Sequence, residues 1–200
     1  MTIPFGKPSG MQAIDILNWE KDYPYRPEVG FEIWHDGQWL HLKYTVNEET
    51  TKAEQTILGG EVFRDSCVEF FIQPDPENDP HYYNFEFNAA GVMYLACRTG
   101  RMDPEYAPRE ILESVKTEST VGPAPFGETA LGKPWTLKVD IPITAFFKHS
   151  FKSWSGLKAK MNLYKCGEGL KTMAFVTWAP IDTPNPDYHR PEFFREAEFE

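Results

Sequence analysis

The chain has 200 residues, of which 41% are hydrophobic and 25% charged, and its formal net charge is −10 at pH 7. This composition is that of a folded globular protein, and the length fits a single domain, residues 1–200. The acidic excess repels polyanions, so nucleic acid and anionic membrane surfaces are excluded as expected partners and a neutral or cationic partner is favoured. Aromatic residues make up 15% of the chain and it has 17 prolines, an excess that favours strands over helices.

Alternating apolar and polar residues predict strands along most of the chain. The segment 38–46 alternates in this way and follows 31–34 across His35-Asp36-Gly37, a sequence typical of a hairpin turn. The same alternation predicts strands at 67–73, 82–88, 92–97, 135–141, 157–164, 173–178 and 193–199, with weaker candidates at 11–19 and 112–120. About ten strands indicate an all-β, antiparallel, two-sheet β-sandwich of the immunoglobulin-like kind.

Only residues 103–113 have a helical character. Pro108 lies too deep in that segment for a regular helix, so one short irregular helical insertion is predicted there. Residues 122–134 contain three prolines and three glycines and are predicted to be a long loop inside the domain.

The cysteines and the N-terminus say little about the compartment. Cys67, Cys97 and Cys166 are odd in number and widely spaced, and we expect small buried side chains, although a single disulfide bridge stays open. The N-terminus lacks the pattern of a signal peptide, and no apolar run reaches the length of about 18 residues that a membrane span requires. The compartment stays open: the chain as written is expected to be cytoplasmic, and a processed chain would be periplasmic or extracellular. The sequence does not indicate the oligomeric state.

Two glutamates lie on the polar faces of strands that are predicted to be neighbours. Glu69 and Glu86 are each followed by an aromatic residue and flanked by alternating apolar positions. Such glutamates are usually solvated or paired with a basic group, but two close carboxylates also bind ligand hydroxyls or act as the acid and base of a glycosidase. The sequence therefore leaves open a structural pair, a ligand-binding pair and a hydrolase acting on O-glycosyl bonds, in that order.

The aromatic excess suggests a saccharide ligand. A sugar ring has apolar faces and a rim of hydroxyl groups, so its site needs flat aromatic surfaces beside carboxylates, amides or guanidinium groups. Trp178 is the favoured surface, because it ends a predicted strand and precedes the loop 179–191. The other candidate surfaces are Phe63, Trp34, Trp39, Tyr82 and Tyr94, and the candidate polar partners are Glu69, Glu86, Asn84, Asn88, Arg64 and Arg98.

Two loops are rich in the oxygen donors that calcium prefers. Asp75 and Asp79 lie in the first loop, and Asp182 and Asp187 in the second, although neither loop has a diagnostic spacing. These four aspartates are the predicted metal ligands, and the metal is a structural Ca²⁺ that no chemistry requires.

Four segments in order resemble a known family. They are RDSCVEFFIQPD, HYYNFEFNAAGVMYLA, PWTLKVDIPITAF and FVTWAPIDTPNPDYHRPEFF, and the match runs from about Phe31 to the C-terminus. The chain is similar to the family 9 carbohydrate-binding modules and their stand-alone relatives. It differs from the xylanase-linked members at Phe63, where they have tryptophan, and at Glu86, where they have arginine.

The resemblance implies a β-sandwich of the DOMON-like kind with bound calcium. It also implies an aromatic clamp formed by Trp178 and Phe63, with Glu69 accepting hydrogen bonds from sugar hydroxyls. The function so implied is non-catalytic binding of a mono- or oligosaccharide from a plant or host glycan, linked to polysaccharide catabolism, since the chain has no room for a separate catalytic domain. A haem-binding DOMON-type domain is a further alternative, with Met93 or Met102 and His81 as its axial pair.

Overall fold

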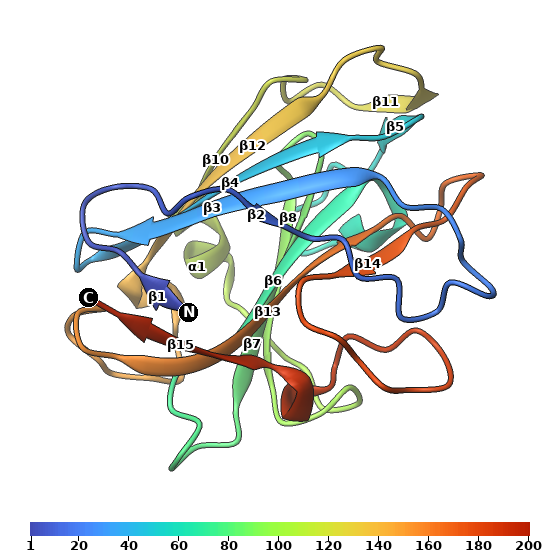
Figure 1. Ribbon diagram of the computed structural model, residues 1–200. Coiled ribbons are helices and arrows are strands. Elements are labelled where there is room, and N and C mark those ends of the chain that lie inside the picture. The colour runs from blue at the N-terminus through green and yellow to red at the C-terminus, as the bar shows by residue number, and fades with distance from the viewer.

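Two β-sheets packed face to face make up the computed structural model, which describes residues 1–200 (Figure 1). The larger sheet has eight strands, and β14 pairs with β13 beside the main path of the other seven. In spatial order these seven are β1 (Thr2–Ile3), β15 (Arg195–Phe199), β13 (Lys158–Cys166), β6 (Cys67–Gln73), β7 (Tyr82–Asn88), β8 (Met93–Arg98) and β9 (Glu105–Tyr106), and β14 is Phe175–Thr177.

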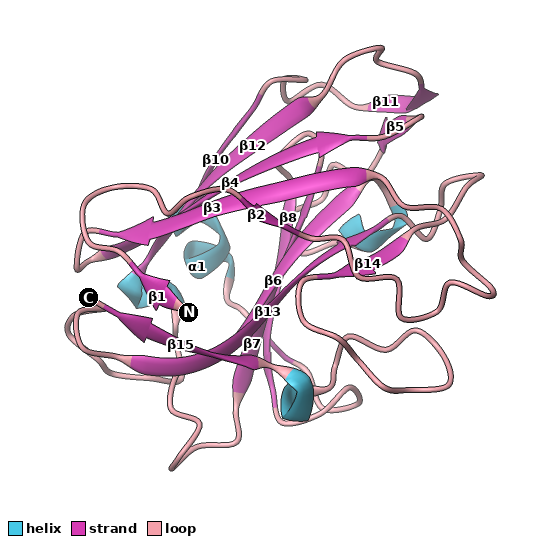
Figure 2. Cartoon of the chain, in the orientation of Figure 1, coloured by secondary structure: helices cyan, strands magenta, loops and turns pink.

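The smaller sheet faces the larger one across the core. It contains five strands, in the order β10 (Lys116–Ser119), β12 (Trp135–Pro142), β4 (Trp39–Asn47), β3 (Glu28–His35) and β2 (Gln12–Ala13). A two-stranded ribbon of β11 (Phe126–Thr129) and β5 (Thr51–Ala53) extends beyond it. All strand pairs are antiparallel except β1 with β15, and the helical elements are short (Figure 2): α1 (Arg109–Ser114) and the 3-10 turns η1 (Val62–Arg64), η2 (Ile143–Ala145) and η3 (Pro191–Phe193).

The core lies between the two sheets and follows from the alternation of the sequence. In β6 and β7 the side chains of Phe70 and Phe85 point inward, and their rings lie 6.1 Å apart. They face a layer from the smaller sheet that includes Leu42 and Val139, which are also buried. Because side chains alternate between the two faces of a strand, this inner layer fixes which residues of the same strands face outward.

The structure confirms the all-β, two-sheet antiparallel sandwich and the predicted hairpin. The turn between β3 and β4 is closed by the Asp36 carboxylate, which accepts hydrogen bonds from the backbone N–H groups of Gln38 at 2.9 Å and Trp39 at 2.7 Å. Gly37 has a φ of 91°, a conformation that glycine adopts without strain. The three cysteines lie in strands, are buried, and are not bridged.

Several predicted boundaries were wrong. The helical segment 103–113 is β9 followed by α1, and Pro108 precedes the first helical residue, where a proline does not interrupt the hydrogen bonding of the helix. The predicted loop 122–134 contains β11, and only two residues of the weak candidate 11–19 form a strand. The structure has fifteen strands rather than about ten, because the strands that the pattern missed, β1, β5, β9 and β11, have only two to four residues and are too short to show a clear alternation.

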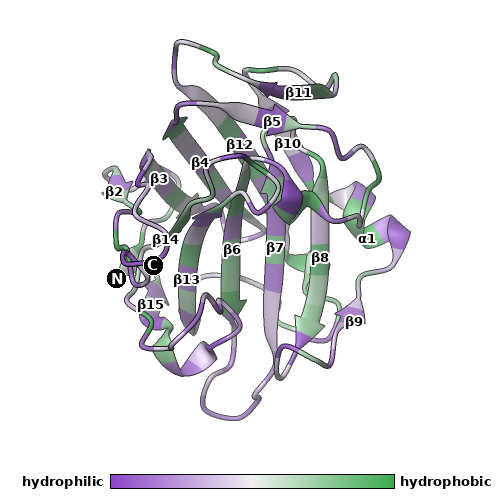
Figure 3. Ribbon diagram, turned by 90° about the vertical axis from the view of Figure 1, so that its right-hand side faces the viewer, coloured by the Kyte–Doolittle hydropathy of each residue, from purple (hydrophilic) through white to green (hydrophobic).

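The outer face of the larger sheet carries the site. Figure 3 looks onto the side where β13, β6, β7 and β8 lie next to one another. Part of this face is covered by a second buried cluster, in which Trp19 and Tyr188 come from segments outside the sheet. Among the helices of the structure, none has the length and apolar character needed to cross a bilayer.

Candidate functional site

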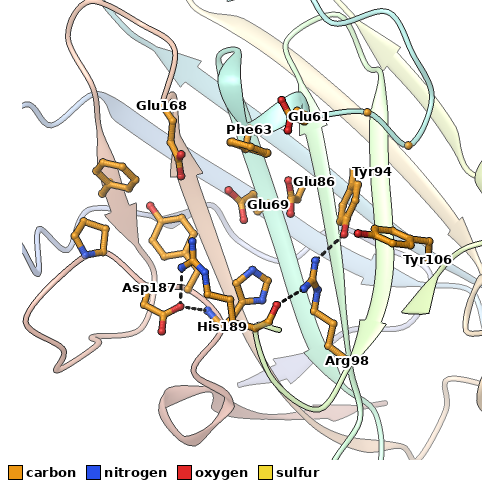
Figure 4. A pocket seen from close by; sticks show the side chains of 16 residues that line it. Glu61, Phe63, Glu69, Glu86, Tyr94, Arg98, Tyr106, Glu168, Asp187 and His189 are labelled. Carbon is orange, nitrogen blue, oxygen red and sulfur yellow. Dashed lines mark hydrogen bonds and ion pairs between the residues drawn. The ribbon is translucent and has the colours of Figure 1, made fainter. Parts of the chain in front are cut away.

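A cavity of about 680 Å³ opens on the outer face of the larger sheet (Figure 4). Its volume is within the usual range for a small-molecule site. Glu69 on β6 and Glu86 on β7 form its floor as directly opposed cross-strand neighbours. The remaining lining residues are Gly59, Gly60, Glu61, Phe63, Tyr94, Arg98, Arg101, Tyr106, Glu168, Phe175, Pro186, Asp187, Tyr188 and His189.

The floor of the pocket follows directly from the sequence pattern. Val68 and Phe70 point into the core, so Glu69 between them must point outward, and Phe85 and Phe87 direct Glu86 to the same side. The predicted adjacency of the two strands is confirmed. The register that places the two carboxylates opposite each other is a property of the sheet.

The two floor carboxylates are nearly withdrawn from water. Glu69 is 4% exposed and Glu86 7% exposed. The Cys166 thiol donates a hydrogen bond to Glu69 Oε1 at 2.9 Å, and Asn84 Nδ2 donates to Glu86 Oε1 at 2.8 Å. No lysine, arginine or histidine nitrogen lies within 4.0 Å of either carboxylate.

Burial dominates the ionisation of both groups. It raises the pKa of Glu69 well above the ordinary value, and the neighbouring Cys166 and Glu86 raise it further. Burial also raises the pKa of Glu86 to about 7, although the hydrogen bond from Asn84 and the charge of Arg98 act in the opposite direction. The pair therefore holds protons more tightly than free carboxyl groups, because two adjacent negative charges in a poorly solvated site are unfavourable.

Arg98 is held in one orientation at the edge of the floor. Its Nε donates to Asn84 Oδ1 at 2.8 Å, its Nη1 to the carbonyl oxygen of Arg101 at 2.6 Å, and its Nη2 to the hydroxyl of Tyr94 at 2.6 Å. Asn84 thus links the guanidinium to Glu86 without lining the pocket itself. All three acceptors of Arg98 are neutral oxygens.

Aromatic side chains form the walls. The rings of Tyr94 and Tyr106 lie 6.0 Å apart at an interplanar angle of 83° on one side of the floor, and Tyr106 is 64% exposed. Phe63, in η1, lies beside Glu69 and Glu86 (Figure 4). Phe175 and Tyr188 also line the pocket. The pocket therefore combines flat apolar surfaces with carboxylate acceptors and a fixed guanidinium.

The C-terminal loop closes one side through a small polar network. Asp187 accepts hydrogen bonds from Arg101 Nη1 at 3.1 Å and from the backbone N–H of His189 at 3.1 Å. His189 Nδ1 lies 3.0 Å from the hydroxyl of Tyr82. Burial and the charges of Arg98 and Arg101 lower the pKa of His189 to about 3, so its imidazole is neutral at pH 7.

Trp178 does not join this pocket. It follows β14 on the same side as Val176 and packs in the core, where its ring meets Phe31 edge to face at 5.8 Å. The guanidinium of Arg195 lies 4.7 Å from the ring centroid, and the tryptophan is 7% exposed. The expected clamp of Trp178 with Phe63 is therefore not formed, because strand alternation directs Trp178 inward and Phe175 outward.

The other predicted ligand residues separate into two groups. Arg98 lines the pocket and Asn84 supports it. Asn88, the last residue of β7, lies outside the lining, and its amide donates to Asp65 Oδ2 at 2.9 Å and to the carbonyl oxygen of Gln55 at 3.0 Å. Arg64 lies outside the lining and pairs with Glu61 at 2.6 Å. The aromatic candidates Trp34 and Trp39 belong to the smaller sheet, and Tyr82 is fully buried.

Sequence reasoning missed several residues of the pocket, chiefly Tyr106, Glu168 and Tyr188. Of these three, only Tyr188 lies in a segment that the sequence singled out, the loop 179–191 after Trp178. No pattern marks Tyr106 or Glu168, which reach the pocket through a two-residue strand and a turn.

The four aspartates predicted to bind calcium lie in two separate loops, and calcium binding stays a prediction. Asp75 accepts from Asn78 at 2.9 Å, and Asp79 is bound to His81 at 2.5 Å. In the other loop Asp187 is paired with Arg101 at 3.1 Å, while Asp182 is exposed. No group of three possible ligand atoms within 4.8 Å of one another includes any of the four.

The haem alternative also lacks a ligand pair. Met93 is buried in the core of the sandwich, Met102 is 90% exposed, and the imidazole of His81 is bound to Asp79. The one group of three possible metal-ligating atoms within 4.8 Å of one another is formed by Cys67, Glu69 and Cys166, of which only Glu69 lines the pocket.

A β-sandwich with an open, aromatic-walled pocket on its outer face and polar groups on the floor has the features of a sugar-binding module. The chain belongs to carbohydrate-binding family 9, whose model matches residues 6–199. No protein of curated function matches the chain significantly.

Solved structures agree with the family assignment. A proposed carbohydrate-binding protein from Bacteroides uniformis is 41% identical to the chain, covers 95% of it and 86% of its own length, and superposes with a TM-score of 0.90. A family 9 module from Caldicellulosiruptor kristjanssonii, solved with cellotriose, is 9% identical, covers 100% of this chain and 93% of its own, and has a TM-score of 0.65. The module from the same organism solved with glucose is 9% identical, with coverages of 100% and 95% and a TM-score of 0.62. The last two comparisons show a shared fold.

Proposed function

We propose that this chain binds a mono- or short oligosaccharide in the pocket above Glu69 and Glu86 and carries out no chemistry on it. Membership of family 9 supports saccharide binding in general, and two family 9 modules of the same fold were solved with glucose and cellotriose. The observation that carries the proposal for this chain is the combination, in one pocket, of aromatic walls with buried hydrogen-bond acceptors. A role in polysaccharide catabolism is part of the same proposal.

The geometry suits a sugar ring in particular. The apolar face of the ring would lie against Tyr106, Tyr94 or Phe63, while hydroxyl groups at its rim would donate to the free oxygens of Glu69 and Glu86. Arg98 would donate only with its remaining N–H groups, because three of them are already engaged. Tyr106 provides the flat surface that was predicted for Trp178.

Isothermal titration calorimetry with glucose, xylose, cellobiose and cellotriose tests the proposal. A ring face that removes about 50 Å² of apolar surface from water contributes about 1.3 kcal/mol, so Tyr106→Ala is expected to weaken binding about tenfold. The matched control is Phe5→Ala, which removes another exposed ring, 53% exposed, outside the pocket. Absence of heat with every saccharide, or equal affinity of Tyr106→Ala and the unaltered chain, would refute the proposed site.

Glycoside hydrolysis is a second candidate, favoured by one observation. The pKa of Glu86 at about 7, beside a second carboxyl group, is what a general acid needs near neutral pH. However, glycosidase carboxyl groups flank the scissile bond, whereas Glu69 and Glu86 lie side by side on one sheet face. Turnover of a chromogenic glycoside that disappears in Glu69→Gln would favour the enzyme over the binding module.

A further inference from the structure

Acidic side chains outnumber basic ones in the lining of the pocket. Its lining includes five carboxylates, and only Arg98 and Arg101 are basic. The neutral imidazole of His189 adds no positive charge. The carboxylates are Glu61, Glu69, Glu86, Glu168 and Asp187.

Two of these five carboxylates are neutralised within the protein. Asp187 is paired with Arg101 at 3.1 Å, and Glu61 with Arg64 at 2.6 Å. Glu69, Glu86 and Glu168 form no ion pair, and the guanidinium of Arg98 is committed to neutral oxygens. The pocket therefore presents three uncompensated carboxyl groups and one guanidinium to a ligand.

The floor carboxyl groups are both buried and incompletely bonded. Glu69 and Glu86 are more than nine-tenths buried, yet each has one oxygen that accepts no hydrogen bond from the protein. Both side chains border the cavity. A neutral ligand would cover them and remove their remaining water without supplying a positive charge, so burial would hold both groups protonated, whereas a cation would favour their ionised form.

We infer that the pocket binds saccharides that carry a protonated amino group, such as glucosamine units, more tightly than neutral saccharides. This inference rests on the proposed sugar-binding function. An ammonium group seated between Glu69 and Glu86 would supply three N–H donors to their two free oxygens, and its positive charge would stabilise the ionised form of both groups, which release their protons to solvent on binding. The rest of the sugar ring would remain against the aromatic wall of Tyr94 and Tyr106.

A divalent metal ion suits these carboxyl groups less well than an ammonium group does. Calcium takes six to eight oxygen ligands at about 2.3–2.6 Å, and no three carboxylates of this pocket bring their oxygens within 4.8 Å of one another. The aromatic walls offer few oxygen ligands but suit an organic cation, which gains from contact with ring faces.

The decisive experiment compares three sugars that share a ring and differ at one substituent: D-glucosamine, D-glucose and N-acetyl-D-glucosamine. Calorimetry near pH 7 at low salt is expected to give D-glucosamine an affinity about tenfold higher than either neutral sugar. Added salt is expected to reduce only the affinity for D-glucosamine. The glucosamine disaccharide and cellobiose provide the same comparison for a longer ligand.

Substitutions test whether the preference for D-glucosamine comes from the carboxyl groups of the pocket floor. Glu86→Gln keeps the shape of the side chain and is expected to bring the affinity for D-glucosamine down to that for D-glucose. The control Glu118→Gln removes one carboxylate from β10 on the smaller sheet, where that side chain is 76% exposed, and is expected to leave the ratio unchanged. Circular dichroism of each variant shows that the fold is retained.

The outcomes are distinguishable. If D-glucose binds as tightly as D-glucosamine, the charge inference is overturned and the sugar-binding proposal stands. If neither sugar binds, both are overturned. If Ca²⁺ binds to the unaltered chain, is lost in Glu86→Gln and excludes D-glucosamine, the pocket is a metal site and the inference fails.

Discussion

The substitution Glu86→Gln is expected to stabilise the protein in a manner that depends on pH. Folding raises the pKa of Glu86 from 4.5 to about 7, mainly through burial. Between these two values the native state holds this proton more tightly than the unfolded chain, so stability falls as the pH rises through this window. Glutamine does not titrate, and its side-chain oxygen still accepts the hydrogen bond from Asn84.

The size of this difference in stability follows from the shift in the pKa of Glu86. Each pKa unit corresponds to about 1.36 kcal/mol, so the unaltered protein loses on the order of 3 kcal/mol through Glu86 once the pH is well above 7. The glutamine variant avoids this loss. Removing the charge at position 86 also lowers the pKa of Glu69, because Glu86 is one of the groups that raise it.

Urea unfolding at about pH 4 and about pH 8 measures this difference. The variant and the unaltered protein are expected to be equally stable at the lower pH, with the variant more stable by up to about 3 kcal/mol at the higher. Glu118→Gln, at an exposed position, is expected to change stability by less than about 0.5 kcal/mol at both. Equal effects of Glu86→Gln at the two pH values, or a loss of stability at pH 8, would refute the argument from burial.

Four further predictions concern stability and reactivity. Lys165→Met is expected to lower the free energy of unfolding by about 3–5 kcal/mol, because it leaves the buried carboxylate of Glu48, its partner at 2.9 Å, without a counter-charge. Adding Glu48→Gln is expected to recover most of this loss, as measured by urea unfolding. Asn88→Ala is expected to destabilise by about 2–3 kcal/mol, since its side chain makes three hydrogen bonds in a turn, and to leave the calorimetric affinity for sugars unchanged. The thiols are expected to resist a thiol reagent at about pH 8 until the protein is unfolded, because burial raises the pKa of Cys67 to about 11; rapid labelling of the native protein would contradict this. Addition of EDTA is expected to leave the thermal unfolding midpoint unchanged, and a clear fall would support calcium binding at the predicted aspartates.

The sequence by itself determined the sandwich and the floor of the site. The period-two alternation of apolar and polar residues in β6 and β7 arises because one face of each strand packs on the core. The order of residues along the strand is therefore enough to tell which side chains face the core. The alternation alone therefore assigns Glu69, Asn84 and Glu86 to the outer face. Within the predicted strand 173–178 it also assigns Val176 and Trp178 to the inner face, where the structure has both of them.

Only the tertiary structure decided how these residues meet and which others join them. The register that opposes Glu69 to Glu86 depends on the pairing of all strands in the larger sheet. Tyr106, Glu168 and Tyr188 reach the pocket from short or irregular segments, whose positions are set by contacts with residues distant in the chain. The charge left uncompensated in the pocket is likewise a result of packing, because it depends on which arginine lies within reach of which carboxylate.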